Sequence, residues 1–165
     1  MQSASELIDR WYGQHASELY HYLAKRCPDA ATAGDLLQET FLQVVRQSDQ
    51  LASVTMPRAW LFAIARNMLA RHYRRQRDPQ PIAQLWYESA PDPKDDRLAA
   101  MQESIRKLPA ELRDTLDLRL EQELSYEEIA HVLDIPIGTV RSRLHNAVRQ
   151  LRGAMRDSEE RTHET

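Results

Sequence analysis

The segment with the most restrictive pattern spans residues 124–152 and reads LSYEEIAHVLDIPIGTVRSRLHNAVRQLR. Ser125 followed three positions later by Glu128 is the pattern of a capping box, which predicts a helix that begins near Tyr126. The Asp-Ile-Pro run at residues 134–136 ends this helix, and its proline suits the first turn of a second helix. The segment therefore predicts two helices joined by a tight turn, the helix-turn-helix motif.

The second helix of this motif has two contrasting faces. Its apolar face is predicted to lie in the core and consists of Val140, Leu144, Val148 and Leu151. The first helix adds the core residues Ile129, Ala130 and Leu133. The other face of the second helix offers hydrogen-bond donors and positive charge, which suit the major groove of DNA. The candidate DNA contacts on this face are Arg141, Ser142, His145, Asn146 and Arg149.

The composition favours helices over sheet, because 42% of the 165 residues are hydrophobic and only four are glycine. We expect an all-α fold of two small helical domains joined by a proline-rich linker, the C-terminal one a four-helix domain that contains the helix-turn-helix. Apolar runs are too short to cross a membrane, and the N-terminus lacks a signal-peptide pattern. We therefore expect no membrane insertion and a cytoplasmic location. With Cys27 as the single cysteine, no internal disulfide can form.

Charge is unevenly distributed along the chain, although the net charge is only −3. Residues 58–77 hold six arginines and no acidic residue, and residues 129–156 hold five arginines and one aspartate. The segments before, between and after these two are acidic on balance. Two basic segments in different helices indicate two separate contacts with a polyanion.

Residues 78–97 contain four of the eight prolines among acidic and polar residues, and we interpret them as a linker. The linker separates a helical domain at residues 5–77 from a second one at residues 98–154. An acidic tail follows at residues 155–165, and from residue 157 on it is expected to be disordered.

Apolar residues at helical spacing predict three helices in the first domain. The first spans residues 5–26, and its buried residues include Leu7, Trp11, Leu19 and Leu23. The second is capped by Thr32 with Asp35, and its core positions are Leu37, Phe41, Val44 and Val45. The third opens at Pro57, and its core positions are Leu61, Ile64, Ala65 and Met68.

The outer faces of the second and third helices are candidate binding surfaces. The second helix carries a polar stripe of Asp35, Gln38, Glu39, Leu42 and Arg46. Such a stripe is most often a solvated helix face, although an exposed leucine within it favours a protein contact. The third helix lines up Trp60, Asn67, Arg71 and Arg74. Bases stack on aromatic rings and arginines neutralise phosphate, so this face suits nucleic acid. An alternative of equal weight is that the tryptophan is a core residue and that the arginines form the solvated end of the helix.

The second domain begins with an apolar stripe of Leu98, Met101, Ile105 and Leu108. Pro109 then restarts a helix whose stripe is Leu112, Leu116 and Leu120. In the linker before this domain, Trp86 and Tyr87 either pack against one of the two domains or contact a partner.

The chain lacks the patterns of common active sites, namely GxSxG, the P-loop, HExxH and CxxC. Its six histidines show no paired spacing of metal ligands. We therefore expect no catalytic residue, no bound metal and no other cofactor.

Three blocks in the same order resemble the extracytoplasmic-function (ECF) group of bacterial RNA polymerase sigma factors, the smallest kind, which have two helical domains and a linker. Residues 35–45, DLLQETFLQVV, resemble the family's polymerase-binding helix. Residues 57–75, PRAWLFAIARNMLARHYRR, resemble the helix that opens the minus-ten promoter element. Leu108-Pro109 and the helix-turn-helix are similar to the domain that reads the minus-thirty-five element. The resemblance covers nearly the whole chain.

The resemblance implies a protein that binds core RNA polymerase and promoter DNA, is controlled by an anti-sigma factor and leaves catalysis to the polymerase. The residues implied for core polymerase binding are Asp35, Gln38, Glu39, Leu42 and Arg46. Those implied for the minus-ten element are Arg58, Trp60, Asn67, Arg71, Arg74 and Arg75, with the loop at residues 48–58. Those implied for the minus-thirty-five element are Arg141, Ser142, His145, Asn146 and Arg149.

The chain departs from the family pattern at a few positions. Glu123 and Asp134 stand where glycine is common, and since aspartate tolerates left-handed backbone, the turn is expected to form. His145 and Asn146 replace more basic or aromatic residues, which leaves the promoter sequence open.

Two other classes of function remain as alternatives. A helix-turn-helix transcription regulator of another class would bind duplex DNA on its own, which footprinting without polymerase distinguishes. A protein-binding helical adaptor would be unaffected by the changes Arg141→Ala and Arg149→Ala.

Overall fold

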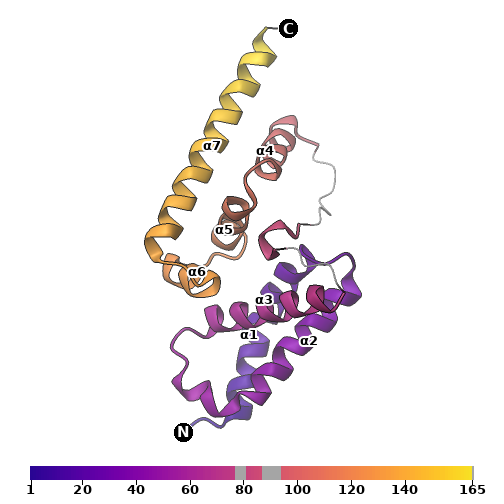
Figure 1. The fold of residues 1–165 in the computed structure, drawn as a ribbon, viewed down its shortest axis with the longest axis vertical. Coiled ribbons are helices and arrows are strands. Elements are labelled where there is room, and N and C mark those ends of the chain that lie inside the picture. The colour runs from indigo at the N-terminus through magenta and orange to yellow at the C-terminus, as the bar shows by residue number, and fades with distance from the viewer. Residues whose placement is uncertain (77–80, 87–93, 165) are drawn as a thin grey trace.

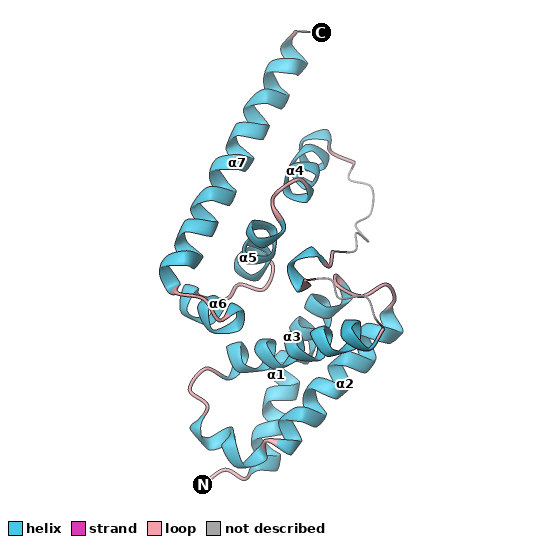
Figure 2. Ribbon diagram, viewed as in Figure 1, coloured by secondary structure: helices cyan, strands magenta, loops and turns pink. Residues whose placement is uncertain are grey.

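The computed structural model describes residues 1–76, 81–86 and 94–164. All regular secondary structure in these ranges is helical, which confirms the all-α prediction (Figure 2). The elements in chain order are α1 (Ala4–Ala24), α2 (Ala30–Arg46), η1 (Ser48–Ser53), α3 (Pro57–Arg75), η2 (Ile82–Gln84), α4 (Asp96–Arg106), α5 (Ala110–Leu120), α6 (Tyr126–Leu133) and α7 (Ile137–His163). None of the helices in the described ranges has the length and apolar character needed to cross a bilayer.

The N-terminal half, residues 1–76, is built from α1, α2 and α3, which pack against one another (Figure 1). Its largest fully buried apolar side chains are Leu19, Tyr22, Leu23, Val44, Leu61, Phe62 and Leu69. Burial of each such side chain contributes about 1.5–3 kcal/mol to folding. The predicted core residues that are buried, and so confirmed, are Trp11, Leu19, Leu23, Phe41, Val44, Leu61, Ile64, Ala65 and Met68.

The start of α2 differs from the prediction. The Asp29 carboxylate accepts a hydrogen bond from the Thr32 amide at 2.7 Å, so the N-cap is Asp29 and not Thr32. The core position predicted for Val45 is also wrong, because this side chain is 50% exposed. The buried face of α2, against which α1 and α3 pack, carries Leu36 and Thr40 instead.

The C-terminal half, residues 94–164, is built from α4 to α7, and α7 packs against each of the other three helices. Its buried apolar side chains are Leu108, Leu116, Leu118, Leu124, Ile129, Val132, Val140, Leu144 and Ala147. The predictions for Leu98, Met101, Leu120 and Val148 are wrong, since all four are exposed. The error in α5 has a physical cause. This helix contacts α6, α7 and η2, and residues 114–118 are all buried, so apolar spacing alone does not identify its inner side.

The helix-turn-helix forms as predicted. Ser125 Oγ accepts a hydrogen bond from the Glu128 amide at 3.1 Å, and α6 begins at Tyr126. Asp134 ends α6 in the left-handed conformation, with φ 52° and ψ 51°. Glu123 also has a positive φ, 56°. Both positions at which the family often has glycine therefore adopt the backbone that glycine favours.

The acidic tail is helical up to residue 163, so the predicted disorder from residue 157 on is wrong over residues 157–163. α7 continues to His163. Its packed first part supplies the costly helix nucleus, and each further residue adds one backbone hydrogen bond. An exposed ion pair between Arg97 of α4 and Glu159 of α7, at 3.7 Å, lies along this extension.

The two halves pack against each other in what we call the closed arrangement. α3 of the N-terminal half contacts α6 of the C-terminal half, and η2 contacts both α3 and α5 (Figure 1). Leu85, next to η2, is only 3% exposed. The segment of the predicted linker around η2 therefore packs onto both halves, and α4 begins at Asp96, two residues before the predicted end of the linker. Tyr87 and three of the four linker prolines, at positions 79, 91 and 93, lie outside the described residues.

Replacement of Asp134 by glycine is expected to stabilise the protein by about 1 kcal/mol, because a Cβ at φ 52° carries a steric cost. The change Asp134→Val should destabilise it, since a branched side chain fits this backbone poorly. Urea denaturation followed by circular dichroism measures both effects. An Asp134→Gly variant that unfolds at lower urea concentration than the wild type would contradict the prediction.

Candidate functional site

The polar face of α7 is accessible. Arg141, Ser142, His145 and Arg149 are exposed and Asn146 is half-buried, while Val140, Leu144 and Ala147 anchor the opposite side in the core. The Ser142 hydroxyl donates to the carbonyl oxygen of Gly138 at 2.9 Å. The predicted face therefore lies on one side of a helix held by its own core contacts, a geometry that fits a DNA groove.

A second side chain of α7 ties this helix to α5. Arg143 is half-buried and forms an ion pair with Glu111 of α5 at 3.3 Å. The pair adds a polar contact between α7 and α5 to the apolar contacts of Val140, Leu144 and Ala147. The ion pair was not predicted from the sequence, because Arg143 and Glu111 belong to different helices and no local pattern links them.

The outer face of α3 is largely accessible. Asn67, Arg71, Arg74 and Arg75 are exposed, and Arg75 reaches Glu39 of α2 at 4.0 Å. Trp60 is half-buried, and its ring meets Trp11 of α1 edge-on at 5.9 Å between centroids. Trp60 thus packs against the core and still presents part of its surface, so the core position is confirmed and a contact with nucleic acid stays a prediction.

Arg58, at the start of α3, is engaged in the contact between the halves. Its Nε donates to the Glu128 carboxylate at 2.9 Å, and its Nη2 donates to the carbonyl oxygen of Glu123 at 2.8 Å. The hydrogen bond that Arg58 donates to Glu128 raises the pKa of Arg58 above its ordinary value. The Glu128 carboxylate therefore pairs with Arg58. The second hydrogen bond of the predicted capping box, from the Ser125 amide to this carboxylate, is replaced by that contact. Arg58 also lines a groove of about 830 Å³ between α1 and α6.

The outer face of α2 is accessible as well. Asp35, Gln38, Leu42 and Arg46 are exposed, and Glu39 is half-buried. Leu42 is 54% exposed, and Val45 on the same helix and Tyr12 of α1 are 50% and 52% exposed. The Tyr12 ring packs edge-on against Phe41 at 4.8 Å, which places it beside α2. Leu42 of the predicted stripe therefore has an exposed apolar neighbour three positions on, Val45, and Tyr12 of α1 lies beside the same helix; we call these three side chains the apolar patch.

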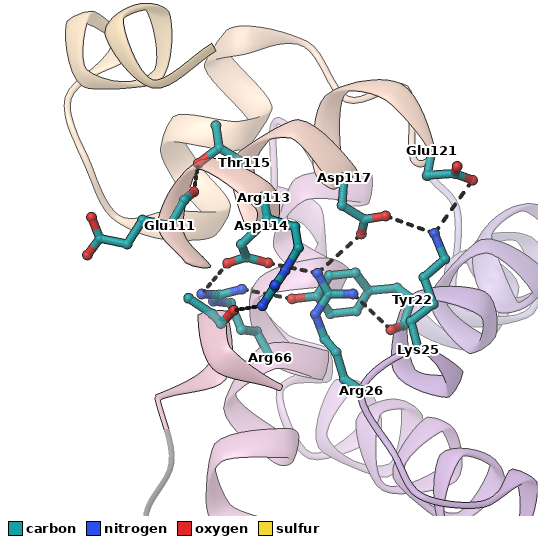
Figure 3. Close-up of polar contacts among 11 residues, drawn as sticks. Tyr22, Lys25, Arg26, Arg66, Glu111, Arg113, Asp114, Thr115, Asp117 and Glu121 are labelled. Carbon is teal, nitrogen blue, oxygen red and sulfur yellow. Dashed lines mark hydrogen bonds and ion pairs between the residues drawn. The ribbon is translucent and has the colours of Figure 1, made fainter. Parts of the chain in front are cut away.

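A buried group of charges joins the two halves, and sequence reasoning missed it (Figure 3). We call it the Arg26 cluster; its members are Tyr22, Lys25 and Arg26 next to or in α1, Arg66 of α3, and Asp114 and Asp117 of α5. Arg26 Nη2 donates to Asp114 at 2.7 Å and to Asp117 at 3.2 Å. Arg26 is only 1% exposed, and its guanidinium lies 3.9 Å from the centre of the Tyr22 ring.

The remaining contacts of the Arg26 cluster run in the same direction, from bases of the N-terminal half to acids of α5. Arg66 Nη2 lies 2.9 Å from Asp114, and Arg66 Nη1 donates to the Tyr22 hydroxyl at 2.8 Å. Lys25 Nζ donates to Asp117 at 3.0 Å. The Trp86 ring lies over this group, 5.3 Å from Lys25 Nζ. Of the two linker aromatics, Trp86 therefore packs against the contact between the halves.

Burial and the neighbouring charges shift the pKa of Asp114 in opposite directions. Burial by itself would raise the pKa of this carboxyl, but the guanidinium groups of Arg26 and Arg66 lower it more, so the pKa lies below its ordinary value of 3.8. Asp114 is therefore ionised throughout the neutral range. Among the described residues, no three His, Cys, Asp or Glu side chains gather as metal ligands do.

Comparisons with known proteins match both halves of the chain. The model of Sigma-70 region 2 matches residues 11–78, and the model of Sigma-70 region 4 matches residues 98–151. The RNA polymerase sigma factor HrpL of Pseudomonas syringae pv. syringae is 32% identical over 162 residues, which cover 91% of this chain and 88% of HrpL. The ECF RNA polymerase sigma factor SigL of Mycobacterium tuberculosis is 34% identical over 154 residues, which cover 88% of this chain and 87% of SigL.

A solved structure also has this fold. It is the sigma factor RpoE in complex with the anti-sigma factor NepR, from Bartonella quintana, with a TM-score of 0.64 and 24% sequence identity. The match covers 90% of this chain and 96% of RpoE.

The pH dependence of the free energy of unfolding should show how much the ionised Asp114 contributes to stability. Because its pKa is lowered on folding, the stabilisation it provides is present above the ordinary carboxyl pKa of 3.8 and is lost as the pH falls through the lower folded value. At pH 7 the change Asp114→Asn should cost about 3–5 kcal/mol, as expected when one partner of a buried ion pair is removed. Denaturation curves at pH 7, 5 and 3 should show a smaller loss in acid for the variant than for the wild type. Equal acid losses in both proteins would contradict this account.

Proposed function

The chain belongs to the ECF group of RNA polymerase sigma factors, and from this membership we propose which of its surfaces carries each step of initiation. As a sigma factor it binds core RNA polymerase and promoter DNA and directs promoter-specific transcription initiation. The observation that carries the proposal is that regions 2 and 4 match in order along the chain. Residues 5–77 serve as region 2, residues 98–154 as region 4, and residues 78–97 as the linker between them.

α7 reads the minus-thirty-five element in this proposal. Arg141, Ser142, His145, Asn146 and Arg149 supply base-edge and phosphate contacts from one helix face. The exposure of this face and the burial of Val140, Leu144 and Ala147 behind it support the assignment, because a helix that enters the major groove must be both accessible and held in orientation.

α3 and the loop before it act at the minus-ten element. Separating the strands costs a few kcal/mol for each unstacked step, and capture of exposed bases must offset that cost. The accessible part of Trp60 offers a stacking surface, while Asn67, Arg71, Arg74 and Arg75 contact the DNA backbone. Arg58 belongs to the same surface, but it can reach DNA only after it leaves Glu128.

α2 docks on core polymerase through Asp35, Gln38, Glu39, Leu42 and Arg46. The apolar patch of Tyr12, Leu42 and Val45 supports this role, because an exposed apolar patch with a polar rim is typical of a protein-binding surface. Nucleotide addition is left to the polymerase, and this chain has no catalytic step of its own. It works in the cytoplasm, where the polymerase works.

An anti-sigma factor holds the chain inactive until a signal arrives. Support for this part comes from the Bartonella quintana protein of the same fold, whose structure contains the anti-sigma factor NepR. Co-purification of the chain with an inhibitory partner from the source cells, and release of transcription on removal of that partner, would test this part.

A reconstituted transcription assay tests the role of α7. Core polymerase and the chain are given a library of genomic fragments, and the transcript starts are sequenced. The double change Arg141→Ala with Arg149→Ala should lower initiation at the promoters found by at least about tenfold, since each specific contact contributes about 1–3 kcal/mol. Binding to core polymerase should persist. The control Lys107→Ala removes an exposed cation from the end of α4.

Two outcomes of this assay would contradict the proposal. Absence of core-dependent initiation at every site would refute the sigma factor function for this chain. Tight footprints on duplex DNA without polymerase would favour an independent transcription regulator.

The change Leu42→Asp tests the docking surface. A charge in the apolar patch should weaken binding to core polymerase by at least about tenfold, because the carboxylate would lose water without gaining a partner. Leu120→Asp is the matched control, since Leu120 is exposed on α5 in the other half. Fluorescence anisotropy of the labelled chain with core polymerase measures both. Equal losses of affinity for core polymerase in the two variants would contradict the assignment of α2 as the docking surface.

A further inference from the structure

The helix α7 extends well past the face assigned to the minus-thirty-five element. It spans Ile137–His163, whereas the match to Sigma-70 region 4 ends at residue 151 and the assigned face ends at Arg149. At about 1.5 Å per residue, residues 152–163 add on the order of 18 Å of helix. Neither the family match nor the proposed reading of the promoter gives this extension a role.

The first part of the extension carries the same charge as the face before it. Residues 141–156 hold five arginines and no acidic residue, whereas residues 157–160 hold three acidic residues and no basic one. Four of the arginines follow one another at intervals of eight, three and four positions, which places them on one face of the helix. They are all exposed, and we call them the arginine stripe: Arg141, Arg149, Arg152 and Arg156.

A solvated helix face commonly mixes both signs of charge, and the arginine stripe does not. Like charges three or four positions apart on a helix repel each other, so Arg149, Arg152 and Arg156 destabilise the free helix. No carboxylate lies between them in the sequence to offset this repulsion. A partner with regularly spaced negative charges would remove the cost, and the phosphates of duplex DNA are such a partner.

Contacts on the other side of α7 hold the extension as a helix. Met155 and Ser158 are half-buried, and α4 packs against α7. Arg97, near the start of α4, pairs with Glu159 at 3.7 Å. Figure 1 shows α7 continuing past α4 as one unbroken helix. The backbone that carries the last two arginines of the stripe is therefore fixed relative to the recognition face.

The length of the arginine stripe exceeds the width of a DNA groove. The N-terminal residues of a recognition helix contact base edges, and the major groove is about 12 Å wide. Arg141 and Arg156 lie about 22 Å apart along the helix axis, at about 1.5 Å per residue. With the start of α7 at the bases, the far end of the stripe lies where the helix leaves the groove, next to the phosphates that border it.

We propose that Arg152 and Arg156 bind the phosphate backbone of the duplex that borders the minus-thirty-five element, whatever its sequence, and so extend the DNA contact of this chain past region 4. The inference rests on the proposed function for the placement of α7 at that element. Each arginine neutralises phosphate and releases counterions, which adds affinity without adding base specificity. The acidic residues from Asp157 to Glu160 end the contact, since carboxylates repel the DNA backbone.

The salt dependence of promoter binding tests both contacts. Core polymerase with the full chain is bound, at a series of salt concentrations, to labelled promoter fragments found by the reconstituted assay. Each phosphate contact contributes about 0.9 to the slope of log affinity against log salt, so Arg152→Ala with Arg156→Ala should lower this slope by about 2. Affinity at about 0.1 M salt should fall at least about fivefold. A double variant with the wild-type slope overturns the proposal.

Two further measurements separate phosphate binding from a structural role. A base change within the minus-thirty-five element should weaken binding by the same factor in the wild type and the double variant, because phosphate contacts carry no sequence information. Arg152→Lys with Arg156→Lys should keep the wild-type slope, since a phosphate contact needs the charge and not the guanidinium fork. A lysine variant that binds as weakly as the alanine variant would contradict the inference. Circular dichroism should show the same helical content in all three proteins.

The matched control is Lys107→Ala with Arg161→Ala, which removes the same charge from exposed positions outside the arginine stripe. Lys107 follows the end of α4, and Arg161 lies nine positions after Arg152, on the opposite side of α7. The control should leave the salt slope unchanged. An equal fall in slope for the control and the test variant would assign the effect to net charge and refute a local contact.

Ethylation of single phosphates shows where the contact lies. Promoter fragments with one ethylated phosphate each are separated into bound and free fractions. Ethylation of one or two phosphates beside the minus-thirty-five element should impair binding of the wild type and should not impair binding of the Arg152→Ala, Arg156→Ala variant. The same set of interfering phosphates in both proteins would exclude the proposed contact.

Failure of this inference can be told apart from failure of the proposed function. Should reconstitution yield no promoter, the proposed function fails. The same salt series with the full chain alone on a duplex of random sequence still decides whether Arg152 and Arg156 bind phosphate, because this contact does not depend on the bases. A slope about 2 lower for the double variant supports the contact, and equal slopes refute it.

Discussion

The buried guanidinium of Arg26, bonded to two carboxylates of α5, is the interaction on which the relation between the two halves depends. Arg26 brings positive charge from the end of α1 into a site from which water is excluded, and only a matching negative charge makes that position tolerable. Asp114 and Asp117 supply it from a helix that lies far along the chain. Because Arg66 shares Asp114, α1 and α3 are both held to α5 by one group of charges.

The charge pattern of the chain serves two purposes. Basic side chains on the outer faces of α3 and α7 are exposed and suit phosphate. Arg26, Arg58 and Arg66 instead form ion pairs between the halves. In the closed arrangement, acidic residues of the C-terminal half therefore pair with basic side chains of the N-terminal half.

Local patterns predicted the helices, the helix-turn-helix and the exposed faces well. Ser125 caps α6, Asp134 takes up left-handed backbone, and Leu42 is exposed, each as predicted. Predictions from apolar spacing did less well where a helix contacts several neighbours. α5 is buried over consecutive residues, including two aspartates, so Leu118 is buried and Leu120 is exposed, against the predicted stripe. The assignment of individual side chains to DNA or polymerase remains a prediction from the family resemblance.

By itself the sequence determined which segments before the acidic tail form the main helices, where α6 begins and ends, and which face of α7 is polar, because these features depend on residues within about four positions of one another. The tertiary structure alone decided which charges are free. Arg58 meets Glu128 across 70 positions and Arg26 meets Asp114 across 88. Such pairs leave no local pattern, since a buried arginine and an exposed one look alike in sequence until the packing of the two halves brings a carboxylate to one of them.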